Sequence, residues 1–134
     1  MLTIFTDGAS LGNPGPMGIG VVIYRDELRV EELSEYIGTG TNNIAEYIAV
    51  IKGLEAAHEM GAIDVHIKSD SQLIIRQLNG EYRVKDPKLK QLKNRVDALC
   101  QGLKVKFEHI PRDKNEEADA LSKAGAELGR KRPQ

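Results

Sequence analysis

The sequence predicts an α/β domain built on a mixed β-sheet. Three runs rich in β-forming residues lie within the first 37 residues, and the short connections between them indicate an antiparallel meander. Two later runs of the same kind alternate with segments whose apolar residues recur every three or four positions, as in amphipathic helices. The strand–helix–strand path after the meander makes the first and fourth strands parallel.

The first three strands are predicted from alternation and turn residues. The first covers residues 2–6 and ends in Asp7, which is followed by a loop dense in Gly and Pro. The second covers residues 19–24, and Arg25-Asp26-Glu27 makes a tight turn into the third, residues 28–37, which alternates loosely and so has a solvated face.

The first helix is expected to begin after a loop at residues 38–43, where Asn42 or Asn43 is a good N-cap. Glu46 falls in its first turn, and Gly61 ends it. One face carries an apolar stripe made of Ile44, Tyr47, Ile48, Ile51 and Leu54.

The fourth strand, residues 65–70, again finishes in an aspartate, Asp70. A helix follows directly and stops at Asn79-Gly80; its pattern comprises Leu73, Ile74, Gln77 and Leu78. If the first and fourth strands are neighbours, Asp7 and Asp70 meet at one edge of the sheet. Ligands of open α/β sheets bind at that edge.

The last third adds a helix, a strand and a helix. The first of these helices has the apolar stripe Leu89, Leu92, Val96 and Leu99, and the strand covers residues 103–110. The final helix is predicted with a stripe of Ala118, Leu121, Ala124 and Leu128. Asp113 or Asn115 is its expected cap, and Asp119 lies near its start. Residues 1–129 are therefore predicted as one domain, and residues 130–134 as a basic, frayed tail.

The composition is that of a soluble globular chain. The 134 residues carry a net charge of −1, so a polyanionic partner needs local basic patches. Cys100 is the single cysteine, which excludes an internal disulfide and favours a reducing compartment. The start of the chain lacks the pattern of a signal peptide, and no apolar run is long enough for a membrane span. We expect a cytoplasmic monomer without an organic cofactor.

Four acids have related placements: Asp7 and Asp70 at strand ends, Glu46 and Asp119 in opening turns of helices. Clustered carboxylates raise each other's pKa, and a hard divalent cation such as Mg²⁺ relieves their repulsion. Two such ions can activate water and stabilise the leaving oxygen of a phosphoryl displacement. A single aspartate at a strand end is usually a turn residue, but four acids in matching contexts favour a metal site.

The chain resembles the ribonuclease H type 1 family over essentially its whole length. The matching stretches are Thr6-Asp7-Gly8 with Gly12-Asn13-Pro14-Gly15-Pro16, Thr41-Asn42-Asn43-Ile44-Ala45-Glu46, Ser69-Asp70-Ser71-Gln72 and Asn115-Glu116-Glu117-Ala118-Asp119. The resemblance implies a five-stranded mixed sheet of order 3-2-1-4-5 with helices on both faces. It also implies hydrolysis of the RNA strand of an RNA/DNA hybrid with two Mg²⁺ or Mn²⁺ ions, leaving 5′-phosphates.

The resemblance further implies a role for each matched residue. Asp7 bridges both metals, Glu46 and Asp70 hold the ion at the leaving group, and Asp119 holds the ion that activates water. The implied substrate-binding residues are Gly8, Asn13, Thr41, Asn42, Asn43 and Gln72. Within this set, Asn13 and Thr41 face DNA phosphates, whereas Asn42, Asn43 and Gln72 read the minor groove and the RNA 2′-hydroxyls. Amides suit the latter task because they both donate and accept hydrogen bonds.

The sequence departs from the family pattern in two places. Residues 80–88 are short and hold no Trp, so the basic helical protrusion that grips DNA in well-studied bacterial members is absent. The lysines around this segment form a reduced substitute: Lys85, Lys88, Lys90 and Lys93. The loop before the last helix has Arg112 where many members have a histidine, and arginine cannot act as a general base.

Two other functions are compatible with the same fold. The departures fit a ribonuclease H-like nucleic-acid binding module with weak or lost cleavage, although a pure binder needs no set of four acids. A 3′–5′ exonuclease of this fold carries Asp-x-Glu on its first strand, and Asp7-Gly8-Ala9 does not match it.

Overall fold

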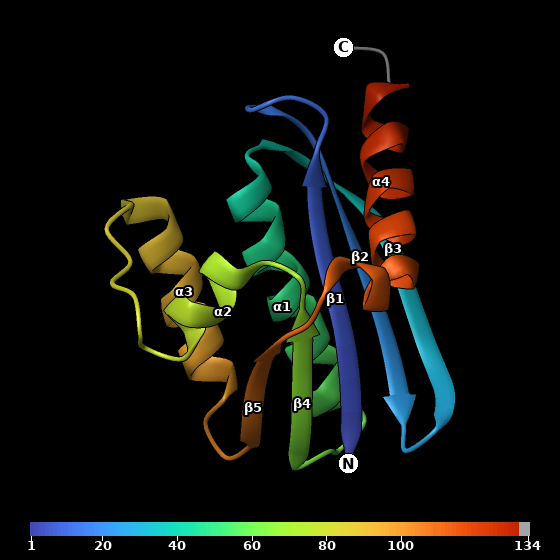
Figure 1. Cartoon of the computed structure of the whole chain (residues 1–134), viewed down its shortest axis with the longest axis vertical. Coiled ribbons are helices and arrows are strands. Elements are labelled where there is room, and N and C mark those ends of the chain that lie inside the picture. The colour runs from blue at the N-terminus through green and yellow to red at the C-terminus, as the bar shows by residue number, and fades with distance from the viewer. Residues whose placement is uncertain (132–134) are drawn as a thin grey trace.

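The sheet has the strand order β3-β2-β1-β4-β5, as predicted (Figure 1). The structure is a computed structural model and describes residues 1–131. β1 pairs antiparallel with β2 and parallel with β4, which in turn pairs parallel with β5. The elements in chain order are β1 (Leu2–Ser10), β2 (Gly15–Arg25), β3 (Leu28–Gly40), α1 (Asn42–Glu59), β4 (Asp64–Ser69), α2 (Gln72–Leu78), α3 (Pro87–Leu99), β5 (Lys104–His109), a 3₁₀ turn (Arg112–Lys114) and α4 (Glu116–Arg130).

Helices cover both faces of the sheet, which confirms the predicted layers. α1 packs on β1 and β2, and α3 packs on the outer side of α1. α4 lies alone on the other face, over β2, β3 and part of β1 (Figure 1). The core lies between the sheet and α1, and Tyr47 at its centre is fully buried with its hydroxyl donating to Gln77 Oε1 at 2.8 Å.

The strands that surround the Gly/Pro loop are longer than predicted. β1 continues to Ser10, so Asp7 lies inside the strand and pairs with Gly20 of β2 rather than ending the strand. The parallel pairing with β4 stops earlier, at Phe5 and Lys68. Asp7 therefore lies two residues beyond the last β1–β4 pair, where β1 and β4 no longer pair with each other.

The buried face of α4 differs from the predicted one. Ala124 is exposed and Leu128 is 53% exposed, whereas the buried residues are small: Ala118, Ser122, Gly125, Ala126 and Gly129. The cause is a very close approach of α4 to β2. A Cβ on Gly18 would lie 2.1 Å from the backbone oxygen of Ser122, and one on Gly20 would lie 2.1 Å from that of Ala118.

The predicted tail is shorter than expected at its start, because Arg130 belongs to α4 and Lys131 caps it. Residues 132–134 of that tail lie outside the described residues. Within residues 1–131, no helix combines the length and the hydropathy needed to cross a bilayer.

Candidate metal centre

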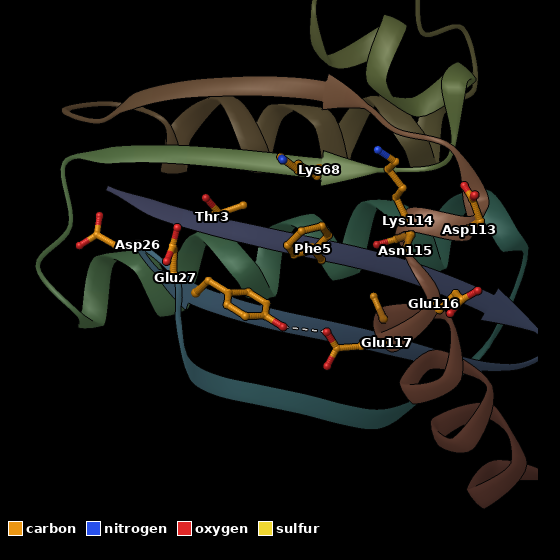
Figure 2. Close-up of a pocket in the computed structure, with 12 residues that line it drawn as sticks. Thr3, Phe5, Asp26, Glu27, Lys68, Asp113, Lys114, Asn115, Glu116 and Glu117 are labelled. Atoms are coloured by element: carbon orange, nitrogen blue, oxygen red, sulfur yellow. Dashed lines mark hydrogen bonds between the residues drawn. The ribbon is translucent and has the colours of Figure 1, made fainter.

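Two hollows lie near the predicted site, and a third lies apart from it. The third lies beside the start of α4, on the part of its sheet face that α4 does not cover. There Phe5 meets Tyr24 edge to face, and the Tyr24 hydroxyl donates to Glu117 (Figure 2). Among the described residues that line it, none is one of the four predicted acids. The acidic cleft, of about 530 Å³, is lined by Asp7, Gly8, Ala9, Ser10, Leu11, Asn42, Asn43, Glu46, Asp70, Ser71, Arg112, Asp119 and Lys123.

Three carboxylates converge in the acidic cleft. Asp7, Glu46 and Asp70 each offer one oxygen, and these oxygens all lie within 4.8 Å of one another. They come from three elements that are far apart in sequence: β1, α1 and the end of β4. The parallel neighbours β1 and β4 bring two of them together, as the sequence predicts.

Asp7 is held on the α4 side of the sheet. Its residue is only 6% exposed, and Ser122 Oγ of α4 donates a hydrogen bond of 2.5 Å to its Oδ2. Burial raises the pKa of Asp7 to about 7, and the neighbouring carboxylates of Asp70 and Asp119 act in the same direction. The Ser122 hydrogen bond and Lys123 oppose this shift because they favour the charged form.

Glu46 reaches the cleft because α1 lies directly on β1 at Gly8. A Cβ on Gly8 would lie 2.2 Å from the backbone carbon of Ala45, so glycine is required for this contact. The Gly8 N–H donates to Glu46 Oε1. Burial raises the pKa of Glu46 well above its ordinary value, and the charge of Asp7 adds to the effect. The sequence predicted Glu46 in the first turn of α1. Since α1 begins at Asn42, Glu46 lies in the second turn instead.

Asp70 follows β4 directly and is half-buried. Burial raises its pKa, the charge of Asp119 adds to this shift, and the Arg112 guanidinium opposes it. Ser71, the next residue, caps α2 by accepting the N–H of Ile74. The start of α2 thus fixes the chain where it leaves the strand.

Asp119 lines the same cleft but lies outside the close triad. It occupies the first turn of α4, as predicted, and its side chain is 23% exposed. Its Oδ2 lies 2.9 Å from Lys123 Nζ, one helical turn further on. The sequence analysis missed Lys123, although an Asp–Lys pair at i and i+4 is a recognisable helix signal. The structure thus brings three of the four acids into contact range and leaves the fourth paired at the rim.

The donor set suits a hard divalent cation. Three carboxylates with raised pKa values repel one another when they ionise, and a cation that prefers oxygen ligands offsets this repulsion. Mg²⁺ and Mn²⁺ both accept such ligands.

The predicted substrate-binding residues fall into three groups. Gly8, Asn42, Asn43 and the auxiliary residue Arg112 line the acidic cleft. A second hollow of about 370 Å³ adjoins it and is lined by Asn13, Thr41, Asn42, Asn43, Ile44, Asp86, Lys88 and Leu89. Gln72 and Lys85 are exposed and line neither of these two hollows.

The start of α1 corrects one detail of the prediction. The N-cap is Thr41, whose Oγ1 accepts the Ile44 N–H at 3.3 Å, and neither Asn42 nor Asn43 has this role. Asn42 instead accepts the N–H of Ser10 on its Oδ1 at 2.8 Å. This bond engages the amide oxygen of Asn42 with the end of β1.

Comparison with known proteins agrees with the fold. Residues 5–125 match the family described as "Reverse transcriptase-like". Ribonuclease HI of Halobacterium salinarum is 43% identical over 120 residues, which cover 88% of this chain and 60% of that protein. Ribonuclease H of Desulforamulus reducens is 37% identical over 93% of this chain and 87% of its own length.

Among solved structures, LC11-RNase H1 in complex with an RNA/DNA hybrid superposes with a TM-score of 0.91 at 40% identity, covering 96% of this chain and 99% of that one. The chain spans 60% of the length of the Halobacterium relative and 34% of that of the mycobacterial relatives. On the shared sheet order, the converging acids and these similarities, the chain belongs to the ribonuclease H type 1 family.

Proposed function

We propose that the chain is a divalent-metal-dependent endonuclease that hydrolyses the RNA strand of RNA/DNA hybrids and leaves 5′-phosphate ends. One observation carries the proposal: two buried carboxylates and one half-buried carboxylate converge in a cleft whose wall also presents the amides of Asn42 and Asn43. The similarity to LC11-RNase H1, which was solved with an RNA/DNA hybrid, supports this substrate class.

The acids hold the metal in this proposal. Asp7 would serve both ions, Glu46 and Asp70 would hold the ion nearer the leaving group, and Asp119 would hold the other. Two divalent ions would supply Lewis acidity and a nucleophilic water for an in-line displacement. Asp119 must exchange its contact with Lys123 for this role, and its exposure at the rim of the cleft permits that movement.

The remaining residues position the duplex. Asn42 and Asn43 have amide donors and acceptors next to the acids, which suits contact with RNA 2′-hydroxyls. Asn13, Thr41 and Lys88 line the adjoining hollow, where a DNA phosphate would find a cation and two polar side chains. Gln72 extends the minor-groove contact from the exposed start of α2. Arg112 contributes charge, since it cannot take up a proton.

The test compares Asp70→Asn with wild type on a labelled RNA/DNA hybrid, a DNA duplex and an RNA duplex, in Mg²⁺, Mn²⁺ or chelator. We expect Asp70→Asn to lose more than about 100-fold in hybrid cleavage, because losing a ligand costs more than losing a residue behind it. Folding, followed by thermal unfolding, should be retained. The matched control is Asp64→Asn, the same substitution at the exposed opposite end of β4. Wild-type cleavage by Asp70→Asn contradicts the proposal.

A second function has a specific observation in its favour. The segment between α2 and α3, residues 79–86, contains no helix, so the basic grip expected for tight hybrid binding is reduced. A binding module with weak or lost cleavage would hold the hybrid without cutting it in either metal. Measuring hybrid binding by fluorescence anisotropy alongside cleavage separates the two functions. The cytoplasmic location and the monomeric state remain proposals that rest on the sequence.

A further inference from the structure

Ser122 is a fully buried hydroxyl directly behind the proposed metal centre. It lies in the second turn of α4, faces β1, and has no exposed surface. Its Oγ donates to Asp7 Oδ2 at 2.5 Å. The same oxygen lies 2.9 Å from the backbone oxygen of Asp119, so one hydroxyl links the strand that carries Asp7 to the turn that carries Asp119.

The packing of α4 against β2 places this hydroxyl next to Asp7. The close approach of α4 to Gly18 and Gly20 places the Ser122 backbone against β2. Asp7 pairs with Gly20 in the neighbouring strand, so the serine and the carboxylate are anchored to the same pair of strands. The backbone contact thus holds the Ser122 backbone directly against the strand that neighbours Asp7.

A hydroxyl has a single proton and can give it to only one acceptor at a time. Of its two neighbours, the carboxylate of Asp7 is the stronger acceptor when ionised, because hydrogen bonds to charged groups are stronger than those to neutral ones. The bond therefore restrains rotation of the Asp7 carboxylate in the state that binds a cation. Without it, the carboxylate would have to be ordered when the cation binds, at a cost in affinity.

We propose that Ser122 is a positioning residue for the metal centre, which orients the Asp7 carboxylate before a divalent cation binds. The proposal rests on the proposed function, since it assumes that Asp7 is a metal ligand. Ser122 does not contact the substrate or the cation. It acts only through Asp7.

The test titrates Mn²⁺ into protein without nucleic acid and follows the EPR signal of the free ion. Ser122→Ala removes the donor and leaves a side chain that fits the same space; we expect about 10-fold or more weaker binding. Ser122→Cys retains a weak donor and should fall between Ser122→Ala and wild type. In cleavage assays, the metal concentration for half-maximal rate should rise in Ser122→Ala, while the KM for hybrid stays unchanged.

The matched control is Ser34→Ala. The Ser34 hydroxyl also bonds α4, donating to the backbone oxygen of Leu121 at 2.6 Å, and this bond involves no carboxylate. We expect wild-type Mn²⁺ affinity in this variant.

If Ser122→Ala binds Mn²⁺ as wild type does, the positioning role is wrong while the metal centre stands. If wild type itself binds no Mn²⁺ and cleaves no hybrid, the proposed function fails first, and the positioning role with it. An equal loss of affinity in Ser34→Ala would also overturn the positioning role, because the effect would then belong to the seating of α4.

Discussion

Position 8 decides whether the candidate centre can form, because its lack of a side chain lets α1 touch β1. Gly8 meets the backbone of Ala45, and its N–H holds the Glu46 carboxylate. Any side chain would have to displace the backbone of α1, since no flexible group is available there to yield. The glycine of the Asp7-Gly8 pair is therefore as necessary to the cleft as the aspartate.

We predict that Gly8→Ala lowers the free energy of unfolding by about 2–3 kcal/mol and weakens Mn²⁺ binding, because the shift of α1 carries Glu46 away from its partners. Denaturant unfolding and the EPR titration measure the two effects. A variant with wild-type stability and wild-type Mn²⁺ affinity would show that α1 can retreat without disturbing the acids.

At the scale of elements, α4 shows how closely a helix can pack when both surfaces are small. The backbone of Ala118, Ser122 and Ala126 lies against the two glycines of β2, and a Cβ on Gly125 would meet the backbone of Glu35 in β3. We predict that Ala126→Leu destabilises the protein by about 2–3 kcal/mol, because no space exists for the larger side chain. Ala124→Leu is the matched control: the same change on the exposed side of the same helix should alter stability by less than about 0.5 kcal/mol. Thermal unfolding of both variants measures the contrast. Equal losses of stability in the two variants would mean that Ala126 is not on the buried face of α4.

This helix also marks the limit of what the sequence could predict. Apolar periodicity located the four α-helices and the five strands, and it identified Tyr47, Ile51 and Leu54 in the core of α1 but missed Val50. Its stripe in α3 was confirmed, because large side chains dominate that interface. In α4 it correctly selected Ala118 but wrongly selected Ala124 and Leu128, because Gly18 and Gly20 of a distant strand help determine which face is buried. The acids could be predicted from their local contexts, but Ser122 could not be singled out, because its partner Asp7 lies far away in the sequence. The Thr41 cap is a local contact with Ile44, and it was missed because Thr41, Asn42 and Asn43 are all residue types that cap helices.

The α3 lysines test the reduced basic grip. Lys88 lines the hollow that also holds Asn13 and Thr41, whereas Lys90 is exposed elsewhere on the same helix. We predict that Lys88→Ala raises the KM for hybrid several-fold at low salt and reduces the slope of log affinity against log salt by about 0.7–0.9, the loss of one phosphate contact. Lys90→Ala should change neither quantity by as much. Identical slopes in both variants would mean that Lys88 makes no phosphate contact.

At the scale of the whole molecule, the acidic cleft makes folding depend on pH and on metal. In the folded chain the pKa of Asp7 is about 7 against an ordinary value of 3.8, and the pKa values of Glu46 and Asp70 are also raised. Between about pH 4 and pH 7 the folded state therefore binds more protons than the unfolded state. The stability that Asp7 contributes is greatest below its ordinary pKa of 3.8, and it is lost as pH rises through the folded-state pKa of about 7.

We predict that, in chelator, thermal stability falls between pH 5 and pH 8, and that the ionisation of Asp7 alone accounts for up to about 3 kcal/mol of this fall. Asp7→Asn, which cannot ionise, should be more stable than wild type at pH 8 and should flatten this dependence, while Asp64→Asn should leave it unchanged.

Millimolar Mg²⁺ should restore stability to wild type at pH 8, where the carboxylates are ionised and repel one another, and do little at pH 5, where protons compete with the ion. Calorimetric scans with and without Mg²⁺ at both pH values decide the matter. If stability does not change with pH in chelator, neither burial nor mutual repulsion raises the pKa values of the three carboxylates, and the proposed stabilisation by a cation fails.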